Sequence, residues 1–213
     1  MIVTIDGPNS AGKGTLASRL AEFYGFTYFD TGMVYRAVAV EMFLKNIDFA
    51  NEAAAEEIAK NLTFERMTEL SKYPEFRGPA GSNNSAVVAS YPKVRAALLK
   101  MQQDFAKNSA TGVVYDGRDT GTTICPDADI KIFVTAAPEV RADRRYRYYQ
   151  SQGVDISYEQ VLADVTARDE RDMNRAVAPL KPAEDAIILD TSNLNADEAF
   201  VEASELINSK LRA

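Results

Sequence analysis

Gly7-Pro8-Asn9-Ser10-Ala11-Gly12-Lys13-Gly14-Thr15 is the stretch that decides how this chain should fold. It follows an apolar run at residues 2–5 (Ile-Val-Thr-Ile) and precedes a helical pattern. A strand, a glycine-rich turn and a helix in this order make a phosphate-binding loop, because the glycines let backbone amides turn inward beside a helix N-terminus. Lys13 adds a full positive charge for the β- and γ-phosphates of a nucleotide. All nine residues are therefore predicted to bind a nucleoside triphosphate.

The residue after Lys13 departs from the general P-loop motif. It is Gly14 rather than Ser or Thr, so the hydroxyl that would approach Mg²⁺ belongs to Thr15, one position later. This Gly-Lys-Gly-Thr form resembles the nucleoside monophosphate kinases, a narrower group than P-loop proteins at large. Asp116 ends a second apolar run and is predicted to lie beside the metal, through a water molecule. The Asn-Lys-x-Asp motif of GTPases does not occur in the sequence, which argues against a GTPase switch.

Apolar runs and helical patterns alternate along the chain. Short runs rich in Ile and Val are typical of strands, and their continuous apolar character favours a parallel sheet that is buried on both faces. These runs occur at residues 2–5, 113–115, 130–134 and 187–189, and residues 28–30 are expected to form a further strand. Helices are predicted at residues 31–44, 51–62, 92–105, 138–153, 157–174 and 196–211, and a turn-rich loop at 72–85. The fold class is therefore α/β, with a P-loop-type parallel sheet of about five strands flanked by helices.

The composition excludes several kinds of chemistry. The 213 residues include no His and one Cys, so a Ser/His or Cys/His pair, a His-ligated zinc and an internal disulfide are impossible. The net charge of −7 argues against general nucleic-acid binding, and no apolar run is long enough to span a bilayer. Met1 is followed at once by a strand pattern rather than a signal peptide, so we expect a cytoplasmic protein without membrane or nucleic-acid partners.

Positive charge is nevertheless concentrated in one region. Seven of the 14 arginines fall between positions 141 and 175. Arg141, Arg144 and Arg145 share one helix face by their spacing, which suits a lid that closes over phosphates. The alternative is a solvated surface of ion pairs, because acidic residues are interspersed among these arginines.

Three further blocks resemble bacterial cytidylate kinase, in the expected order over nearly the whole chain. They are Asp30-Thr-Gly-Met-Val-Tyr-Arg36, Asp116-Gly-Arg118-Asp119 and Arg168-Asp-Glu-Arg-Asp172-Met-Asn-Arg175-Ala-Val-Ala-Pro-Leu180, with Tyr91-Pro-Lys-Val-Arg95 between the first two. Arg168, Asp172 and Arg175 also share one helix face by spacing, and they continue the apolar stripe of Val161 and Val165. An exposed ladder of Arg/Asp ion pairs is the alternative interpretation of that face.

The resemblance implies a role for each matched residue. Arg168 and Asp172 would hold the ribose of CMP, the guanidinium groups of Arg36, Arg118 and Arg175 its phosphate, and Asp119 and Arg95 its base. Asp119 could equally be a turn residue and Arg95 a surface cation. Catalysis would rest on Lys13, Arg118, Arg141 and Arg145, and Arg144 would bind ATP. The implied organisation is a core of residues 1–36, 107–138 and 158–213, an NMP-binding lobe of residues 37–106 and a lid of residues 139–157.

Two departures from the family leave the strictness of cytosine selection open. Ala86 stands where the family usually has a serine, although Ser85 is adjacent. Residues 63–84 are shorter and less regular than the small sheet the family inserts there.

The implied reaction is ATP- and Mg²⁺-dependent phosphorylation of CMP and dCMP. The nucleophile is a phosphate oxygen that is already anionic, so no general base is required, which agrees with the absence of histidine. The alternatives are a kinase for UMP or AMP, a shikimate-like kinase for an alcohol with Asp30 or Asp119 as its base, and a non-catalytic nucleotide sensor. We expect small-molecule substrates only, and a monomer.

Overall fold

The computed structural model describes residues 1–77 and 79–212. By its internal contacts the chain divides into two compact units. The first contains Met1–Phe29 and the chain from Ser109 onward, and the second contains Asp30–Asn108. The expected boundaries of the core, the NMP-binding lobe and the lid stay predictions.

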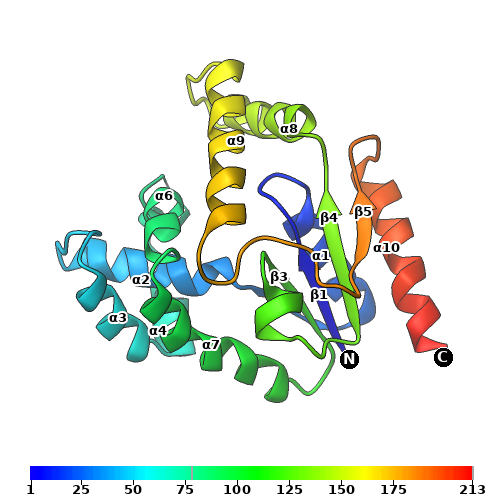
Figure 1. Ribbon diagram of the computed structural model, residues 1–213, viewed down its shortest axis with the longest axis horizontal. Coiled ribbons are helices and arrows are strands. Elements are labelled where there is room, and N and C mark those ends of the chain that lie inside the picture. Colours follow the sequence, from blue (N-terminus) through cyan, green and yellow to red (C-terminus); the bar gives the residue numbers. More distant parts are fainter. Residues whose placement is uncertain (78, 213) are drawn as a thin grey trace. The chain divides into compact units, whose positions relative to one another are not determined.

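The first unit is built on a five-stranded sheet with the order β2-β3-β1-β4-β5. Figure 1 shows β3, β1, β4 and β5 side by side in this order. The strands of the sheet are β1 (Ile2–Asp6), β2 (Thr27–Asp30), β3 (Val113–Gly117), β4 (Ile130–Thr135) and β5 (Ile187–Asp190). β1 pairs in parallel with β3 and with β4, and β4 pairs in parallel with β5. β1, β3 and β4 are buried almost throughout, as their apolar runs predict. β5 differs: Ile187 and Ile188 are 44% and 54% exposed, because this strand forms an edge of the sheet.

Helices α1 (Lys13–Tyr24) and α10 (Ala196–Leu211) build one hydrophobic core with the sheet. Leu16 and Leu20 of α1 pack in one buried cluster with Ile207 of α10 and with Val3 and Ile5 of β1. Side chains alternate between the two faces of a strand, so Thr4 and Asp6 of β1 point to the opposite face. On that side β1 contacts a short π-helical turn, η1 (Thr120–Ile124), which follows β3.

The arginine-rich segment of the first unit is a pair of packed helices. α8 (Pro138–Ser151) follows β4 and packs against α9 (Tyr158–Asn174) through a small core of Ala142, Val161 and Val165 (Figure 1). Ser157 and Gln160 form a capping box at the start of α9. Both helices were predicted from the sequence.

The second unit is helical in its described residues from Gly32 to Lys107. It contains α2 (Gly32–Leu44), α3 (Glu52–Lys60), α4 (Phe64–Leu70), α5 (Pro74–Arg77), α6 (Pro79–Val88) and α7 (Pro92–Lys107). The prediction of a turn-rich loop at residues 72–85 is wrong, because this stretch contains α5 and most of α6. Pro74 opens a helix, where its missing N–H costs nothing. Gly81 lets α6 approach α5, since a Cβ there would lie 2.4 Å from the carbonyl oxygen of Glu75.

No helix in the described part of the chain is long and apolar enough to cross a membrane.

Candidate active site

The phosphate loop between β1 and α1 has a shape that requires its glycines. Gly7 has a φ of 148°, and a Cβ there would lie 1.9 Å from the carbonyl oxygen of Val134 in β4. Gly12 has a φ of 94° and precedes the first residue of α1. An L-residue with a side chain rarely adopts these conformations, so glycine is the residue that fits. The predicted order of strand, loop and helix is confirmed.

Lys13 is buried at the start of α1, with 6% of its surface exposed. Its Nζ donates a hydrogen bond of 2.8 Å to the carbonyl oxygen of Pro8, across the mouth of the loop. Burial lowers the pKa of Lys13 to about 8, against an opposing attraction from Asp116. A buried lysine beside a helix N-terminus favours the binding of an anion.

Other parts of the first unit hold the loop in place. The Thr191 hydroxyl donates to the carbonyl oxygen of Ala11 at 3.1 Å, and Arg141 Nη1 donates to that of Asn9 at 3.3 Å. Ser10 adopts a positive φ of 63° between these two anchored residues. The loop is therefore supported from β5's C-terminal end and from α8.

Gly14 brings the loop close to the carboxylate of Asp116. A Cβ at Gly14 would lie 3.2 Å from Asp116 Oδ2, which is tighter than ordinary van der Waals contact. The same Oδ2 accepts a hydrogen bond of 3.2 Å from the Tyr28 hydroxyl. The departure from Gly-Lys-Ser therefore has a structural counterpart, since the missing side chain leaves room for Asp116.

A second group of charged residues surrounds the loop after β3 and the end of α9. Arg118 Nε donates to Asp172 Oδ2 at 2.5 Å, and Arg175 Nη2 donates to Asp119 Oδ1 at 3.0 Å. We call these four residues the acceptor cluster: Arg118, Asp119, Asp172 and Arg175. Asp119 is 5% exposed, so its carboxylate is buried together with its ion pair. Two ion pairs therefore join the loop after β3 to the end of α9, although these segments lie more than 50 residues apart in the sequence.

Arg175 and Asp172 have distinct settings within this cluster. α9 ends at Asn174, so Arg175 is the first residue beyond the helix, and its Nε also donates to the carbonyl oxygen of Ala178 at 2.5 Å. Burial raises the pKa of Asp172, but the charges of Arg118, Arg168 and Arg175 outweigh it and hold this pKa below its ordinary value. Arg168 thus lies within electrostatic reach of the cluster, one helical turn before Asp172.

The three arginines predicted for the lid face different surroundings. Arg141 is 3% exposed and binds both carboxylate oxygens of Asp169 in α9, at 3.0 and 2.5 Å, while its Nε donates to Ala136. Arg144 reaches the Thr191–Leu194 segment. Arg145 donates to the Tyr149 hydroxyl and lies over that ring, 4.8 Å from its centre. The three arginines lie close together on α8, but each has different hydrogen-bond partners.

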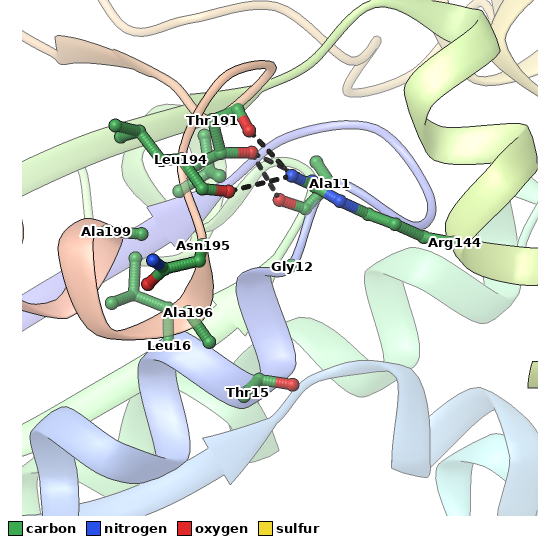
Figure 2. Close-up of a pocket in the computed structure, with 11 residues that line it drawn as sticks. Ala11, Gly12, Thr15, Leu16, Arg144, Thr191, Leu194, Asn195, Ala196 and Ala199 are labelled. Carbon is green, nitrogen blue, oxygen red and sulfur yellow. Dashed lines mark hydrogen bonds between the residues drawn. The ribbon is translucent and has the colours of Figure 1, made fainter.

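A cavity of about 230 Å³ lies beside the phosphate loop. Figure 2 shows Arg144 extending from α8 to hydrogen-bond with Thr191 and Leu194 at one side of this pocket, while Gly12 and Leu16 lie on another. Its lining residues are Ala11, Gly12, Thr15, Leu16, Val134, Arg144, Thr191, Leu194, Asn195, Ala196 and Ala199. Most of these side chains are apolar, and the first turn of α1 forms part of the pocket wall.

Arg36 and Arg95 belong to the second unit. Arg36 is half-buried in α2. Arg95 in α7 is 7% exposed, donates to the carbonyl oxygen of Ala89 at 3.3 Å and lies over the Tyr35 ring, 5.4 Å from its centre. The alternative that Arg95 is a surface cation is wrong, because the guanidinium is buried against this aromatic ring.

Three residues that organise the site were not predicted from the sequence. Asp6 accepts hydrogen bonds from the loop after β3, Asp169 pairs with Arg141, and Thr191 supports the phosphate loop. The role of Asp6 could have been predicted, because a carboxylate at the buried end of an apolar strand needs hydrogen-bond donors nearby. The partners of Asp169 and Thr191 lie far away in the sequence and gave no such signal.

A sheet with these parallel pairings and a lysine-bearing phosphate loop after its first strand defines a P-loop protein. The sequence model of the cytidylate kinase family matches residues 3–209, and the chain belongs to that family. It is 49% identical over 211 residues to a cytidylate kinase of Paramagnetospirillum magneticum, with 98% of each chain covered. A cytidylate kinase of Xanthobacter autotrophicus is 47% identical over 210 residues, covering 99% of this chain and 98% of the relative.

Solved structures agree on the fold. An uncharacterized protein from Eubacterium ventriosum superposes with a TM-score of 0.55 at 15% identity, covering 98% of both chains. A Thermus thermophilus protein gives 0.50 at 21% identity, covering 99% of this chain and 97% of the other. At such identities the likeness concerns the fold alone.

Proposed function

We propose that this chain transfers the γ-phosphoryl group of ATP to CMP and dCMP, giving ADP and the nucleoside diphosphate. The observation that carries the proposal is the acceptor cluster, two Arg/Asp pairs in the same compact unit as the phosphate loop. Their residues are those that the family resemblance assigns to CMP. A kinase of this family uses ATP as the co-substrate, and its substrates are small molecules.

The phosphate loop and the neighbouring pocket are proposed to bind ATP. Residues 7–15 would surround the β- and γ-phosphates, with Lys13 between them and the helix N-terminus behind. The adenosine would then occupy the 230 Å³ pocket, which adjoins the loop at Ala11, Gly12 and Thr15. Arg144 would cover one side of the base, because a guanidinium stacks well on an aromatic ring.

The acceptor cluster is proposed to bind CMP. A phosphate group would bind Arg118 and Arg175, since a planar guanidinium offers two parallel donors to phosphate oxygens. Asp172 and Arg168 would hold the ribose, and Asp119 would accept from the cytosine 4-amino group. Arg36 and Arg95 of the second unit are proposed to act on the phosphate and the base by family resemblance.

The residues near Gly14 suit a magnesium ion. In the described part of the chain no cluster of three or more acidic or thiol side chains could hold a metal alone. Mg²⁺ in phosphotransferases needs only one or two carboxylates, because phosphates and waters complete its six ligands. Asp116, and Thr15 one residue beyond Gly14, would supply the protein's share, in part through water. When bound, the ion would neutralise charge on the triphosphate.

The reaction needs positioning and charge stabilisation rather than proton transfer. An oxygen of the CMP phosphate forms a bond to the γ-phosphorus as the bond from that phosphorus to the ADP oxygen breaks, and ADP leaves with the electron pair. Lys13 and Arg118 would stabilise charge on the transferring group. Arg145, which forms no ion pair among the described residues, is proposed to join them when the lid closes.

Arg141 is proposed to position the loop instead of touching the phosphoryl group. Its donors already bind Asp169, Ala136 and Asn9, and its side chain is 3% exposed. A contact with substrate would require breaking a bidentate ion pair in a buried setting. The pair links α8 and α9 to the phosphate loop without entering the reaction.

The remaining sequence expectations are proposed as well. The chain would work as a monomer in a reducing cytoplasm, where its one cysteine stays reduced. Cys125 is buried, and burial raises the pKa of its thiol to about 11, so it is poorly reactive. Light scattering of the purified chain measures its mass directly, and a dimer mass would contradict the monomer.

The test is a coupled ADP-release assay with ATP and Mg²⁺ and the acceptors CMP, dCMP, UMP, AMP, GMP and shikimate. Activity with CMP and dCMP at least tenfold above the other acceptors supports the proposal. Preference for another monophosphate or for shikimate would replace it. Nucleotide binding without turnover of any acceptor would favour a sensor.

A further inference from the structure

Asp6 is a buried carboxylate to which the proposed mechanism gives no role. It ends β1, is 5% exposed and directly precedes Gly7 of the phosphate loop. Its Oδ1 accepts from the backbone N–H and the hydroxyl of Thr120, and its Oδ2 accepts from the N–H of Gly121, each at 2.8 Å. All three donors belong to the segment that follows Arg118 and Asp119.

We propose that Asp6 is a positioning residue for the acceptor side of the reaction. It holds the start of η1 against β1, so that Arg118 and Asp119 face Asp172 and Arg175. This inference rests on the proposed function, because it names the residue that orients the CMP-binding loop. Asp6 itself touches no substrate.

The local geometry explains why a carboxylate is needed there. The N–H groups of Thr120 and Gly121 open a helical turn and have no carbonyl partner within it. A negative charge at the start of a helical turn satisfies them and interacts favourably with their dipoles. Gly121 lies so close to β1 that a Cβ would be 2.8 Å from Thr4 Oγ1. The start of η1 therefore lies directly against β1, and the Asp6 carboxylate holds it there.

The hydrogen bonds of Asp6 act on the acceptor loop, whereas the phosphate loop is affected only by its charge, which acts on Lys13 less than Asp116 and Arg118 do. The backbone of Asp6 is fixed by pairing opposite Gly117 of β3 and Phe133 of β4, which no side-chain change removes. The phosphate loop has its own supports, namely the hydrogen bonds from Thr191 to Ala11 and from Arg141 to Asn9. Among the described residues, no group of residues 7–15 donates a hydrogen bond to the Asp6 carboxylate. If Asp6 only stabilised the fold, its loss would change the KM for CMP and the KM for ATP alike.

Asp6→Asn tests this distinction. The amide keeps the size of the side chain but places an NH₂ group against donors, so at least one backbone N–H loses its acceptor. We expect the KM for CMP to rise by about tenfold or more, and the KM for ATP to change by less than about twofold. Ile207→Ala, a change in the α10 core, is the control for lost stability alone. It should lower the unfolding midpoint without separating the two KM values.

A graded pair at Thr120 keeps the test decisive if Asp6→Asn does not fold. Thr120→Val removes only the hydroxyl donor and should raise the KM for CMP by about threefold, whereas Thr120→Ser keeps the donor and should match the unmodified protein. The inference is overturned if the two KM values move together, or if neither Asp6→Asn nor Thr120→Val moves the KM for CMP. Failure of the unmodified chain to phosphorylate CMP would instead overturn the proposed function, and that measurement comes first.

Discussion

The phosphate loop and the acceptor cluster lie in the same compact unit but are held together by different forces. The loop takes its shape from the backbone, with Gly7 packed against Val134 and carbonyl groups bonded to Thr191 and Arg141. The cluster takes its shape from two ion pairs between segments more than 50 residues apart. A side chain can therefore be removed from the loop without changing its shape, whereas each member of the cluster depends on its partner.

The difference also concerns charge. The four cluster side chains balance one another, with two guanidinium groups and two carboxylates, before any substrate binds. The loop keeps one buried lysine whose hydrogen-bond acceptor is a neutral carbonyl group. Burying a charge with so little compensation is costly and is a common mark of a functional site. The following variants test whether the two regions behave as differently as this contrast requires.

The largest effect is expected for Lys13→Met, which leaves the backbone of the loop intact. Turnover with ATP and CMP should fall by about 10³-fold, because a preorganised charge on the transferring phosphoryl group is lost. The free energy of unfolding, measured with urea, should not fall, because a buried charge has been replaced by an apolar side chain of similar length.

Lys131→Met is the matched control for this variant. Lys131 is 8% exposed and, like Lys13, donates from Nζ to a carbonyl group five residues earlier, that of Pro126. It also pairs with Asp185, and none of its hydrogen bonds among the described residues reaches residues 7–15. This variant should keep its turnover. A comparable loss of turnover in both variants would show that the effect at Lys13 is structural.

The next largest effect is expected at Asp169, whose pair with Arg141 links α9, the helix that carries Asp172, to the phosphate loop. Asp169→Asn breaks the bidentate pair with Arg141 and leaves a buried guanidinium without its counter-charge. The free energy of unfolding should fall by about 3 kcal/mol, as for other buried pairs that lose one partner. Asp143→Asn is the control, because its pair with Arg147 is exposed and of the i, i+4 kind, and it should leave the unfolding midpoint unchanged.

The proposed role of Arg141 is decided by its conservative variant. Arg141→Lys keeps the charge but cannot form the paired hydrogen bonds. We expect a higher KM for ATP, since Asn9 loses its support, and a kcat within about fivefold of the unmodified protein, because this residue does not touch the phosphoryl group. A kcat reduced by about 10³-fold at saturating substrates would show that Arg141 acts on the transferring phosphoryl group.

A smaller effect is expected within the acceptor cluster. Asp172→Asn should raise the KM for CMP by about 10- to 100-fold, because the loss of a charged hydrogen bond costs about 1.5 to 3 kcal/mol. The KM for ATP should stay within about twofold, since the phosphate loop does not depend on this pair. Glu170→Gln, an exposed change on the same helix, should alter neither value. Equal changes in both KM values would remove the distinction between the two regions.

The same contrast explains what the sequence could predict. Each residue of the phosphate loop was predictable, because the local backbone conformation of the loop requires glycines at fixed positions. The environment of Arg141 was not, since its burial depends on Asp169, 28 positions later, and spacing alone placed it with Arg144 and Arg145. The exposure of Ile187 and Ile188 depends on strand order, which apolar runs do not encode.

The helices between residues 72 and 85 show the limit of local signals. Pro, Gly and Asn are frequent there and predict turns, yet α5 and α6 form. The close approach of Gly81 to the backbone of Glu75 indicates that packing between these short helices outweighs weak propensity. The roles of the acceptor residues required a comparison with a family, because ion pairs between distant segments leave no pattern at fixed spacing.

The smallest effect concerns the charge state of Lys13. Its pKa of about 8 lies below its ordinary value of 10.5, so between these values the folded chain binds fewer protons than the unfolded chain. Stability should therefore rise with pH from about 8 to 10.5, and Lys13→Met should abolish that part of the rise. The charges that act on this amine are those of Asp116, Arg118, Asp6 and Arg168.

Of these charges, Asp116 has the largest influence, and it raises the pKa of Lys13. Asp116→Asn removes this attraction, so the amine should lose its proton at a lower pH than in the unmodified protein. The shift can be followed by NMR through the εCH₂ signal of Lys13, assigned by its loss in Lys13→Met. Asp127→Asn removes an exposed carboxylate elsewhere and should leave the midpoint unmoved. A higher midpoint in Asp116→Asn would mean that Asp116 does not stabilise the charged lysine, and the arrangement proposed for the metal and the triphosphate would lose its electrostatic basis.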